Sequence, residues 1–250
     1  MKKKWFFFLI GLMLCLFSLP LSTKMMMELI HNQNMDTRYQ ITDVNEEFDA
    51  AKSTYRFHNN TIEIKEVIQN DESYVDPWDY KIALADLFLV INGEEIDTLQ
   101  NYPVRVEEGG LNRYYGEIAY LTVEDKKLDK TQFIILLKKT REIIKETPDG
   151  SINGFVPQAE LQYTMYTLED GKGIVSESFH LPERNGLQTK LLNTGMVVPS
   201  SIGYYTDAFY VFPSLFFPII FPFCTLITGV IFLIIFFPFK KFKNSKTKKA

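Results

Sequence analysis

The side chains best suited to chemistry in this sequence form a short acidic and aromatic stretch near residue 75. Its carboxylates supply the oxygen ligands that calcium prefers, and aromatic rings beside carboxylates can bind sugars or cationic groups. The spacing does not match an EF-hand loop, and a plainer interpretation is a solvated loop whose Trp78 seals a sandwich edge. We predict a partner or ligand surface made of Asp71, Glu72, Tyr74, Asp76, Trp78 and Asp79.

The serine, cysteine and histidine residues form no recognisable nucleophile or metal motif. Nucleophilic hydrolysis needs Ser or Cys beside a base, but Cys15 and Cys224 fall inside apolar runs and no Gly-x-Ser-x-Gly occurs. His31, His58 and His180 lack the close pair that zinc sites usually show. We therefore assign no catalytic, metal-binding or cofactor-binding residue and expect no cofactor. A surface hydrolase with a carboxylate pair stays open as an alternative, because acidic residues are abundant.

The charges of the chain are segregated. All 31 acidic residues lie between two long apolar runs, while both outer flanks carry only lysine as charged residues. Nine of the 27 basic residues lie in those flanks, so residues 24–208 have a net charge of −13. A segment this acidic should not bind nucleic acid, whose phosphates require Lys and Arg. Short lysine-rich flanks stay in the cytoplasm, so residues 1–4 and 240–250 are predicted inside and the acidic segment outside.

The first apolar run, Trp5–Leu21, resembles both a short membrane span and a secretory signal. Good cleavage positions are missing, so we favour an uncleaved signal-anchor at residues 5–22 over a cleaved signal peptide. Pro20 is expected to break the helix near its end. Met25–Asn32 can continue the same helix outward.

The second apolar run, Phe209–Phe239, predicts a transmembrane helix over residues 214–238. Its proline-free part is too short to span a bilayer, so the helix must pass through Pro222 with a kink. Neither run contains an acidic or basic side chain, so the spans are interpreted as anchors and not as a transport path. Gly229 is interpreted as an ordinary small residue, because no GxxxG pattern is present.

The acidic segment, residues 24–208, is long enough for one domain with its own core. Turn signals separate runs of alternating apolar residues, which predicts an antiparallel, sandwich-like β domain. The strongest hairpin signal is Asn92-Gly93. Residues 133–144 fit either a strand or a helix, and the turn that follows favours a hairpin. The strands are expected at 61–69, 80–91, 115–123, 159–168 and 173–180.

Two further segments are assigned from weaker signals. Asp43 and Glu46 resemble a capping box that opens a short helix to about Lys52. Residues 187–201 are interpreted as the connector from the domain to the membrane. The acidic segment contains no cysteine, so it must be held by packing, which is more typical of a bacterium without a strong oxidative folding system than of a eukaryotic secretory protein.

Together these observations predict a membrane-anchored bacterial envelope protein with both termini in the cytoplasm. The central domain would be extracytoplasmic and would bind an envelope or membrane protein, with the lipid bilayer as the other partner. We favour a binding protein over an enzyme. The alternatives are the hydrolase above and an accessory subunit of a transport or secretion complex.

Overall fold

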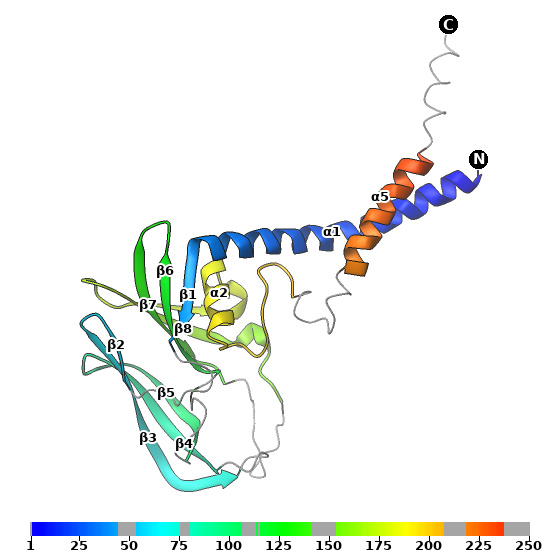
Figure 1. Ribbon diagram of the computed structural model, residues 1–250. Helices are drawn as coiled ribbons and strands as arrows, with labels where there is room; N and C mark the ends of the chain where they lie inside the picture. Colours follow the sequence, from blue (N-terminus) through cyan, green and yellow to red (C-terminus); the bar gives the residue numbers. More distant parts are fainter. Residues whose placement is uncertain are drawn as a thin grey trace. The chain divides into compact units, whose positions relative to one another are not determined.

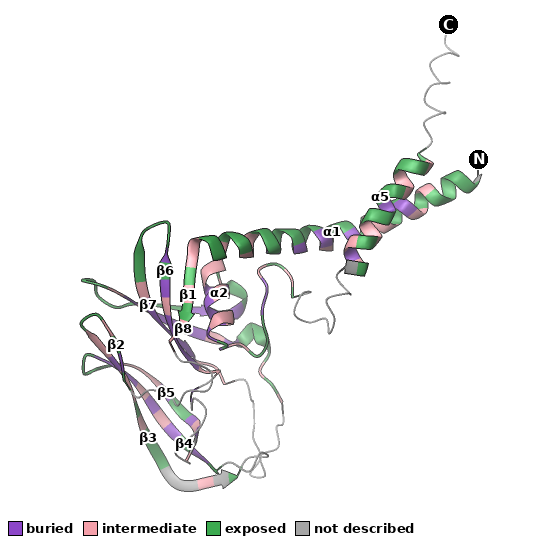
Figure 2. Cartoon of the chain, viewed as in Figure 1, coloured by how far each residue is buried: buried purple, intermediate pink, exposed green. Residues whose placement is uncertain are grey.

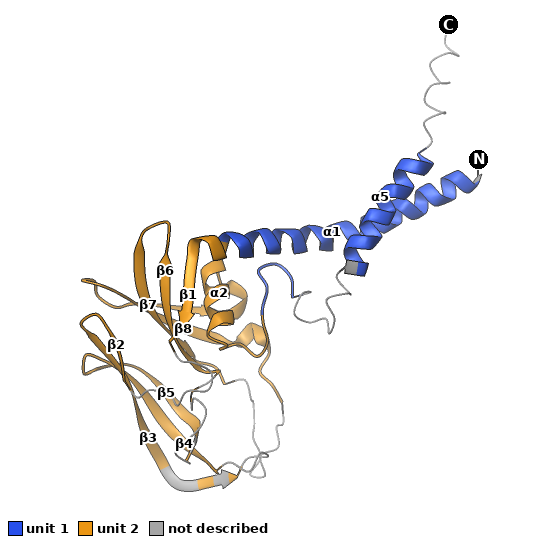
Figure 3. Ribbon diagram, viewed as in Figure 1, with its two compact units in different colours: residues 1–34, 202–250 blue, residues 35–201 orange. Residues whose placement is uncertain are grey.

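The computed structural model describes residues 2–44, 54–75, 81–106, 114, 116–141, 154–207 and 219–237. The chain divides into two compact units (Figure 3). One unit combines residues 1–34 with 202–250 and contains the apolar helices; the other, residues 35–201, contains the β-sheets.

All described strands pair antiparallel, in two sheets (Figure 1). Within the described ranges, one sheet has the order β1-β6-β7-β8-β9 and the other β2-β3-β4-β5. The prediction of a mainly antiparallel β domain is confirmed. The strands are β1 (Tyr39–Asp43), β2 (Thr54–Phe57), β3 (Asn60–Val75), β4 (Lys81–Ile91), β5 (Glu94–Arg105), β6 (Ile118–Asp125), β7 (Lys130–Lys138), β8 (Gln162–Glu169) and β9 (Val175–His180).

The two sheets share one hydrophobic core. Along β4, Leu87, Leu89 and Ile91 are buried at every second position, because side chains of a strand alternate between its faces. They belong to the same buried cluster as side chains of β6 and β7 in the other sheet. Tyr55 of β2 stacks on Tyr120 of β6, with ring centroids 4.1 Å apart. The core therefore lies between the two sheets.

The second face of the five-stranded sheet is also buried (Figure 2). Helix α2 (Gly186–Thr194) lies near this face, since a Cβ on Gly195 would lie 2.4 Å from the Cβ of Ala119 in β6. A capping box starts the helix: Asn185 accepts from the backbone of Gln188, and the Gln188 side chain accepts from the backbone of Asn185. The prediction that residues 187–201 form only a connector is therefore wrong, since the cap and the buried Leu191 and Leu192 stabilise a packed helix.

The strongest local signals are confirmed. β4 and β5 are joined by the Asn92-Gly93 turn, where both residues have positive φ, 54° and 86°. That is the turn that Asn-Gly favours between strands. Each of the other expected strands also corresponds to a strand of the structure.

Two ambiguous segments are resolved in part. Residues 130–138 form strand β7, which pairs with β8, so the hairpin interpretation is confirmed for this part. Buried neighbours on both faces explain why its pattern also resembled a helix. Asp43 ends strand β1 and pairs with Leu121, so it does not begin a helix as expected. The remainder of that expected helix, including Glu46, lies outside the described residues.

Helix α1 (Lys2–Arg38) runs without interruption through Pro20, so the predicted break there is wrong. A proline removes one backbone donor, and a long helix tolerates that loss where its neighbours continue the ladder. The expected continuation over Met25–Asn32 is confirmed. Among the described residues, one helix is long and apolar enough to cross a bilayer, and it is Lys3–Arg38.

The last described segment, residues 219–237, begins with irregular backbone and then becomes helical. The turn η3 (Ile219–Cys224) contains Phe221 in an extended conformation, and helix α5 (Thr225–Phe236) follows. The expected kink at Pro222 is confirmed, because Phe221 directly before it departs from helical geometry. The apolar helical stretch Ile220–Phe236 is shorter than a typical span, and residues 208–218 lie outside the described part.

Candidate functional site

The predicted acidic surface lies where β3 loses its regular pairing with β4. Ile68 pairs with Ala85 and Ser73 with Ala83, so residues 69–72 face a single residue of β4. Asp71 and Glu72 therefore belong to a bulge, a feature that re-aims side chains and is common near functional sites. Tyr74 follows it in β3, opposite Ile82. The remaining predicted residues, Asp76, Trp78 and Asp79, lie outside the described residues.

Apolar side chains are exposed around this bulge. Val67 and Val75 are each 54% exposed, and Ile68 and Leu84 are exposed as well. Leu84 is the β4 residue that faces the bulge. Exposed apolar residues that gather into a patch can mark an interaction surface. We call the region of β3 and β4 around the bulge, residues 67–75 with Leu84, the bulge surface; Val67 and Leu84 lie on one face of the strand pair, and Ile68 and Val75 lie on the other.

A second polar cluster joins the two sheets. The Tyr166 hydroxyl of β8 donates to Asp97 Oδ2 of β5 at 2.7 Å, and Lys139 Nζ donates to Asp97 Oδ1 at 2.6 Å. Burial raises the pKa of Tyr166, and the hydrogen bond to Asp97 raises the pKa further. With a hydroxyl and an ammonium both bound to it, this carboxylate stabilises the packing of the sheets.

Other carboxylates of the β unit are engaged in the same way. Lys138, whose side chain is 3% exposed, donates to the Gly116 carbonyl at 2.7 Å and lies 3.0 Å from Glu117. Tyr114 donates to Glu66 at 3.0 Å. Buried charges require such partners. Glu117 and Glu66 are therefore residues that stabilise the fold.

The histidines lie in unrelated surroundings. His31 packs beside Tyr204, His58 occupies the β2–β3 turn 3.9 Å from Asp170, and His180 is exposed at the end of β9. In the part of the chain that the structure describes, no three His, Cys, Asp or Glu side chains form a group able to hold a metal ion.

The structure shows a close helix pair that the sequence interpretation missed. A Cβ on Gly11 of α1 would lie 2.9 Å from the Gly229 carbonyl oxygen of α5, and a Cβ on Gly229 would lie 2.8 Å from Cys15 Sγ. Ser18 and Thr225 share a hydrogen bond of 2.7 Å. The interpretation of Gly229 as an ordinary residue is therefore wrong. The sequence does contain a signal for this packing, because small residues recur four positions apart in both apolar helices. They are found at positions 11 and 15, 18 and 22, and 225 and 229.

One buried carboxylate in the helical unit was also missed. Glu28 of α1 is 3% exposed, and its Oε2 accepts a hydrogen bond from the Thr206 backbone at 3.0 Å. Gly203 comes so close that an added Cβ would lie 2.4 Å from Glu28 Oε1. The segment 202–207 therefore covers this carboxylate, which only tertiary contacts could reveal.

No protein-family model, curated protein or solved structure matches this chain.

Proposed function

We propose that the protein is anchored in the bacterial cytoplasmic membrane by α1 and the C-terminal apolar segment together. The acidic β unit would be extracytoplasmic, both termini cytoplasmic, and the bulge surface would bind an envelope or membrane protein. We take residues 214–238 as the second span, of which the structure describes 219–237. No cofactor takes part in this function.

The antiparallel contact of α1 and α5 is the observation that supports membrane anchoring by both helices. Phe7 stacks on Phe236 near one end of the pair, with ring centroids 4.9 Å apart, and Ser18 bonds to Thr225 further along. The beginning of α1 and the end of α5 therefore lie at the same end (Figure 1). Both lysine-rich flanks continue from that end, which suits one cytoplasmic side.

The length of the helices supports an anchor made of both. Twelve residues of α5 reach about 18 Å as regular helix, less than the ~30 Å hydrocarbon core. Small residues let α5 pack closely on α1, and such packing drives helix association in lipid. The preceding turn η3 and the residues before it would supply the remaining length.

The continuity of α1 supports retention of the N-terminal segment. The helix runs unbroken through residues 19–24, and Ser22 and Met25 are buried. Cleavage near residue 22 would cut a packed helix. Mass spectrometry of the purified protein should therefore find the uncleaved N-terminus.

Sidedness can be tested with single cysteines and a membrane-impermeant maleimide on intact cells. Lys126→Cys, in an exposed turn between β6 and β7, should react in intact cells. Lys3→Cys and Lys246→Cys should react only after lysis, and the wild-type chain measures the background of Cys15 and Cys224. The reverse pattern would disprove the proposed orientation.

Partner binding can be tested by placing a photo-crosslinking amino acid at Val75 in cells. Leu128 is the matched control because it is also 54% exposed but lies in the β6–β7 turn. A discrete crosslinked product from Val75 and none from Leu128 is expected. The product should disappear when Asp71→Asn and Glu72→Gln are added, since both variants keep the shape and remove the charge. Equal products from both positions would contradict a specific surface.

A further inference from the structure

We infer that the lipid-contacting surface of α1 continues beyond Leu21 to Ile30. Hydrocarbon of the outer leaflet would then cover Met26, Met27, Leu29 and Ile30. The inference rests on the proposed membrane anchoring and extends it, because it places Glu28 at membrane depth.

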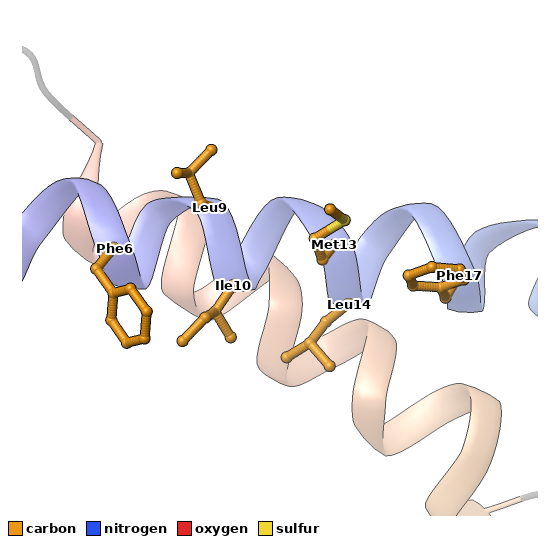
Figure 4. Close-up of a pocket in the computed structure, with 6 residues that line it drawn as sticks. All are labelled: Phe6, Leu9, Ile10, Met13, Leu14 and Phe17. Atoms are coloured by element: carbon orange, nitrogen blue, oxygen red, sulfur yellow. The ribbon is translucent and has the colours of Figure 1, made fainter.

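The apolar surface of α1 does not end with the first run. Met26, Met27, Leu29 and Ile30 are all exposed, and they follow the exposed apolar side chains of the run along the same helix. Part of that earlier surface is a shallow hollow of about 310 Å³ with an entirely apolar lining (Figure 4). The lining residues are Phe6, Leu9, Ile10, Met13, Leu14 and Phe17. Large apolar side chains without small residues favour lipid over a packed helix.

The polar side chains between residues 22 and 30 are compatible with hydrocarbon. Ser22 is buried. Thr23 donates its hydroxyl to the Leu19 carbonyl at 2.9 Å, which satisfies it within the helix. Lys24 is exposed, and its long stem allows the ammonium to reach the headgroups. Glu28 is the one acidic residue in this interval.

Glu28 does not face the lipid. Its side chain is buried and accepts the Thr206 backbone hydrogen bond, while Gly203 packs against the carboxylate. A carboxylate at membrane depth is tolerated when protein covers it and supplies hydrogen bonds. The segment 202–207 provides both. Its position explains how an acidic residue can lie within an otherwise apolar surface.

The residues after Ile30 mark the outer boundary. The His31 ring lies 4.4 Å from the Tyr204 ring and 6.0 Å from the Tyr205 ring, and amphipathic aromatic residues gather at the headgroup level. From Trp5 to Ile30 the helix is about 39 Å long. That length exceeds the ~30 Å hydrocarbon core and fits the ~40–45 Å total, so with hydrocarbon reaching Ile30 the helix tilts or its first residues lie in the inner headgroup region.

The test measures the reaction rate of single cysteines with a charged maleimide. Purified full-length protein is reconstituted into phosphatidylethanolamine and phosphatidylglycerol vesicles, and freeze–thaw places the reagent on both sides. Met26→Cys and Ile30→Cys are the test variants. Leu12→Cys, inside the run, is the protected reference and Asn34→Cys the accessible one. Denatured protein gives full labelling, and the wild-type chain gives the background.

Met26→Cys and Ile30→Cys should react at least about tenfold more slowly than Asn34→Cys, because the reactive thiolate forms in water. Rates equal to that of Asn34→Cys, with Leu12→Cys still protected, would overturn the inference and leave the anchor intact. Fast reaction of Leu12→Cys would instead overturn the anchor.

Discussion

Gly11 and Gly229 allow α1 and α5 to touch through their backbones. A Cβ on Gly11 would lie 2.9 Å from the Gly229 carbonyl oxygen and 2.7 Å from the Cβ of Phe232. In lipid, where no hydrophobic force draws helices together, such close packing and interhelical hydrogen bonds must hold them. The Ser18–Thr225 hydrogen bond is of that second kind. Helices α1 and α5 are therefore packed directly against each other within the helical unit.

A disulfide should form between residues 18 and 225 when both are replaced by cysteine. The Ser18 and Thr225 hydroxyl oxygens are 2.7 Å apart, so Ser18→Cys with Thr225→Cys brings two thiols together. The oxidised protein is cleaved by a protease between the two helices and analysed by non-reducing electrophoresis. The N-terminal and C-terminal fragments should remain linked by the disulfide. Phe17→Cys with Thr225→Cys is the control, because Phe17 is 73% exposed. Equal linking in the control would contradict the packing described.

Gly229→Leu should separate the two helices. The new side chain has no room beside Cys15, whose sulfur would be 2.8 Å from its Cβ, so overpacking is expected to cost about 1–3 kcal/mol. Added to the Ser18→Cys and Thr225→Cys variant, it should lower the yield of the disulfide several-fold. Val230→Leu changes an exposed neighbour and should leave the yield unchanged. Retention of the full yield in Gly229→Leu would disprove the close approach.

Tyr166→Phe should destabilise the β unit. The variant removes the hydroxyl that donates to Asp97 at 2.7 Å across the two sheets. A hydrogen bond to a charged group contributes roughly 1.5–3 kcal/mol, so the free energy of unfolding in urea should fall by about that amount. Tyr205→Phe, a half-exposed tyrosine of the helical unit, is the matched control. A change no larger than the control's would mean that Lys139 alone holds Asp97.

The stability of the β unit should depend on Asp125 in acid. The Arg38 hydrogen bond, with help from the backbone of Lys127 and Leu128, lowers the pKa of Asp125 below its ordinary value of 3.8. Because the pKa of Asp125 is lower in the folded state than in the unfolded chain, the ionised carboxylate stabilises the fold at pH values above the unfolded-state pKa. This stabilisation is lost as the pH falls through the pKa that Asp125 has in the folded state.

The difference in the free energy of unfolding between wild type and Asp125→Asn should therefore be largest above about pH 5 and shrink towards pH 3. Urea unfolding at several pH values measures it. Arg38→Gln should reduce the same acid dependence, because only the backbone of Lys127 and Leu128 then still lowers the Asp125 pKa, and the double variant should lose little more than Asp125→Asn alone. A difference independent of pH would show that the Arg38 contact does not act through the ionised carboxylate.

Several features of the fold followed from local pattern. Alternating apolar residues predicted the position of β4, and Asn92-Gly93 predicted the turn after it. Both features depend on residues close together in the sequence: the alternation of side chains along a strand, and the positive φ that Asn and Gly adopt in a tight turn. The two apolar runs likewise predicted the apolar helices α1 and α5. Of the predicted acidic surface, Asp71, Glu72 and Tyr74 lie in β3, and their role in binding stays a prediction.

The sequence by itself determined the strand periodicity, the apolar segments and the acidic character of the β unit, because these are properties of neighbours in the chain. The tertiary structure alone decided that β7 is buried on both faces, that α2 packs where a connector was expected, and that Gly229 meets Gly11. It also decided that Glu28 is covered by residues far along the chain. The physical reason is that each of these outcomes depends on contacts between distant segments, whose packing overrides local preference.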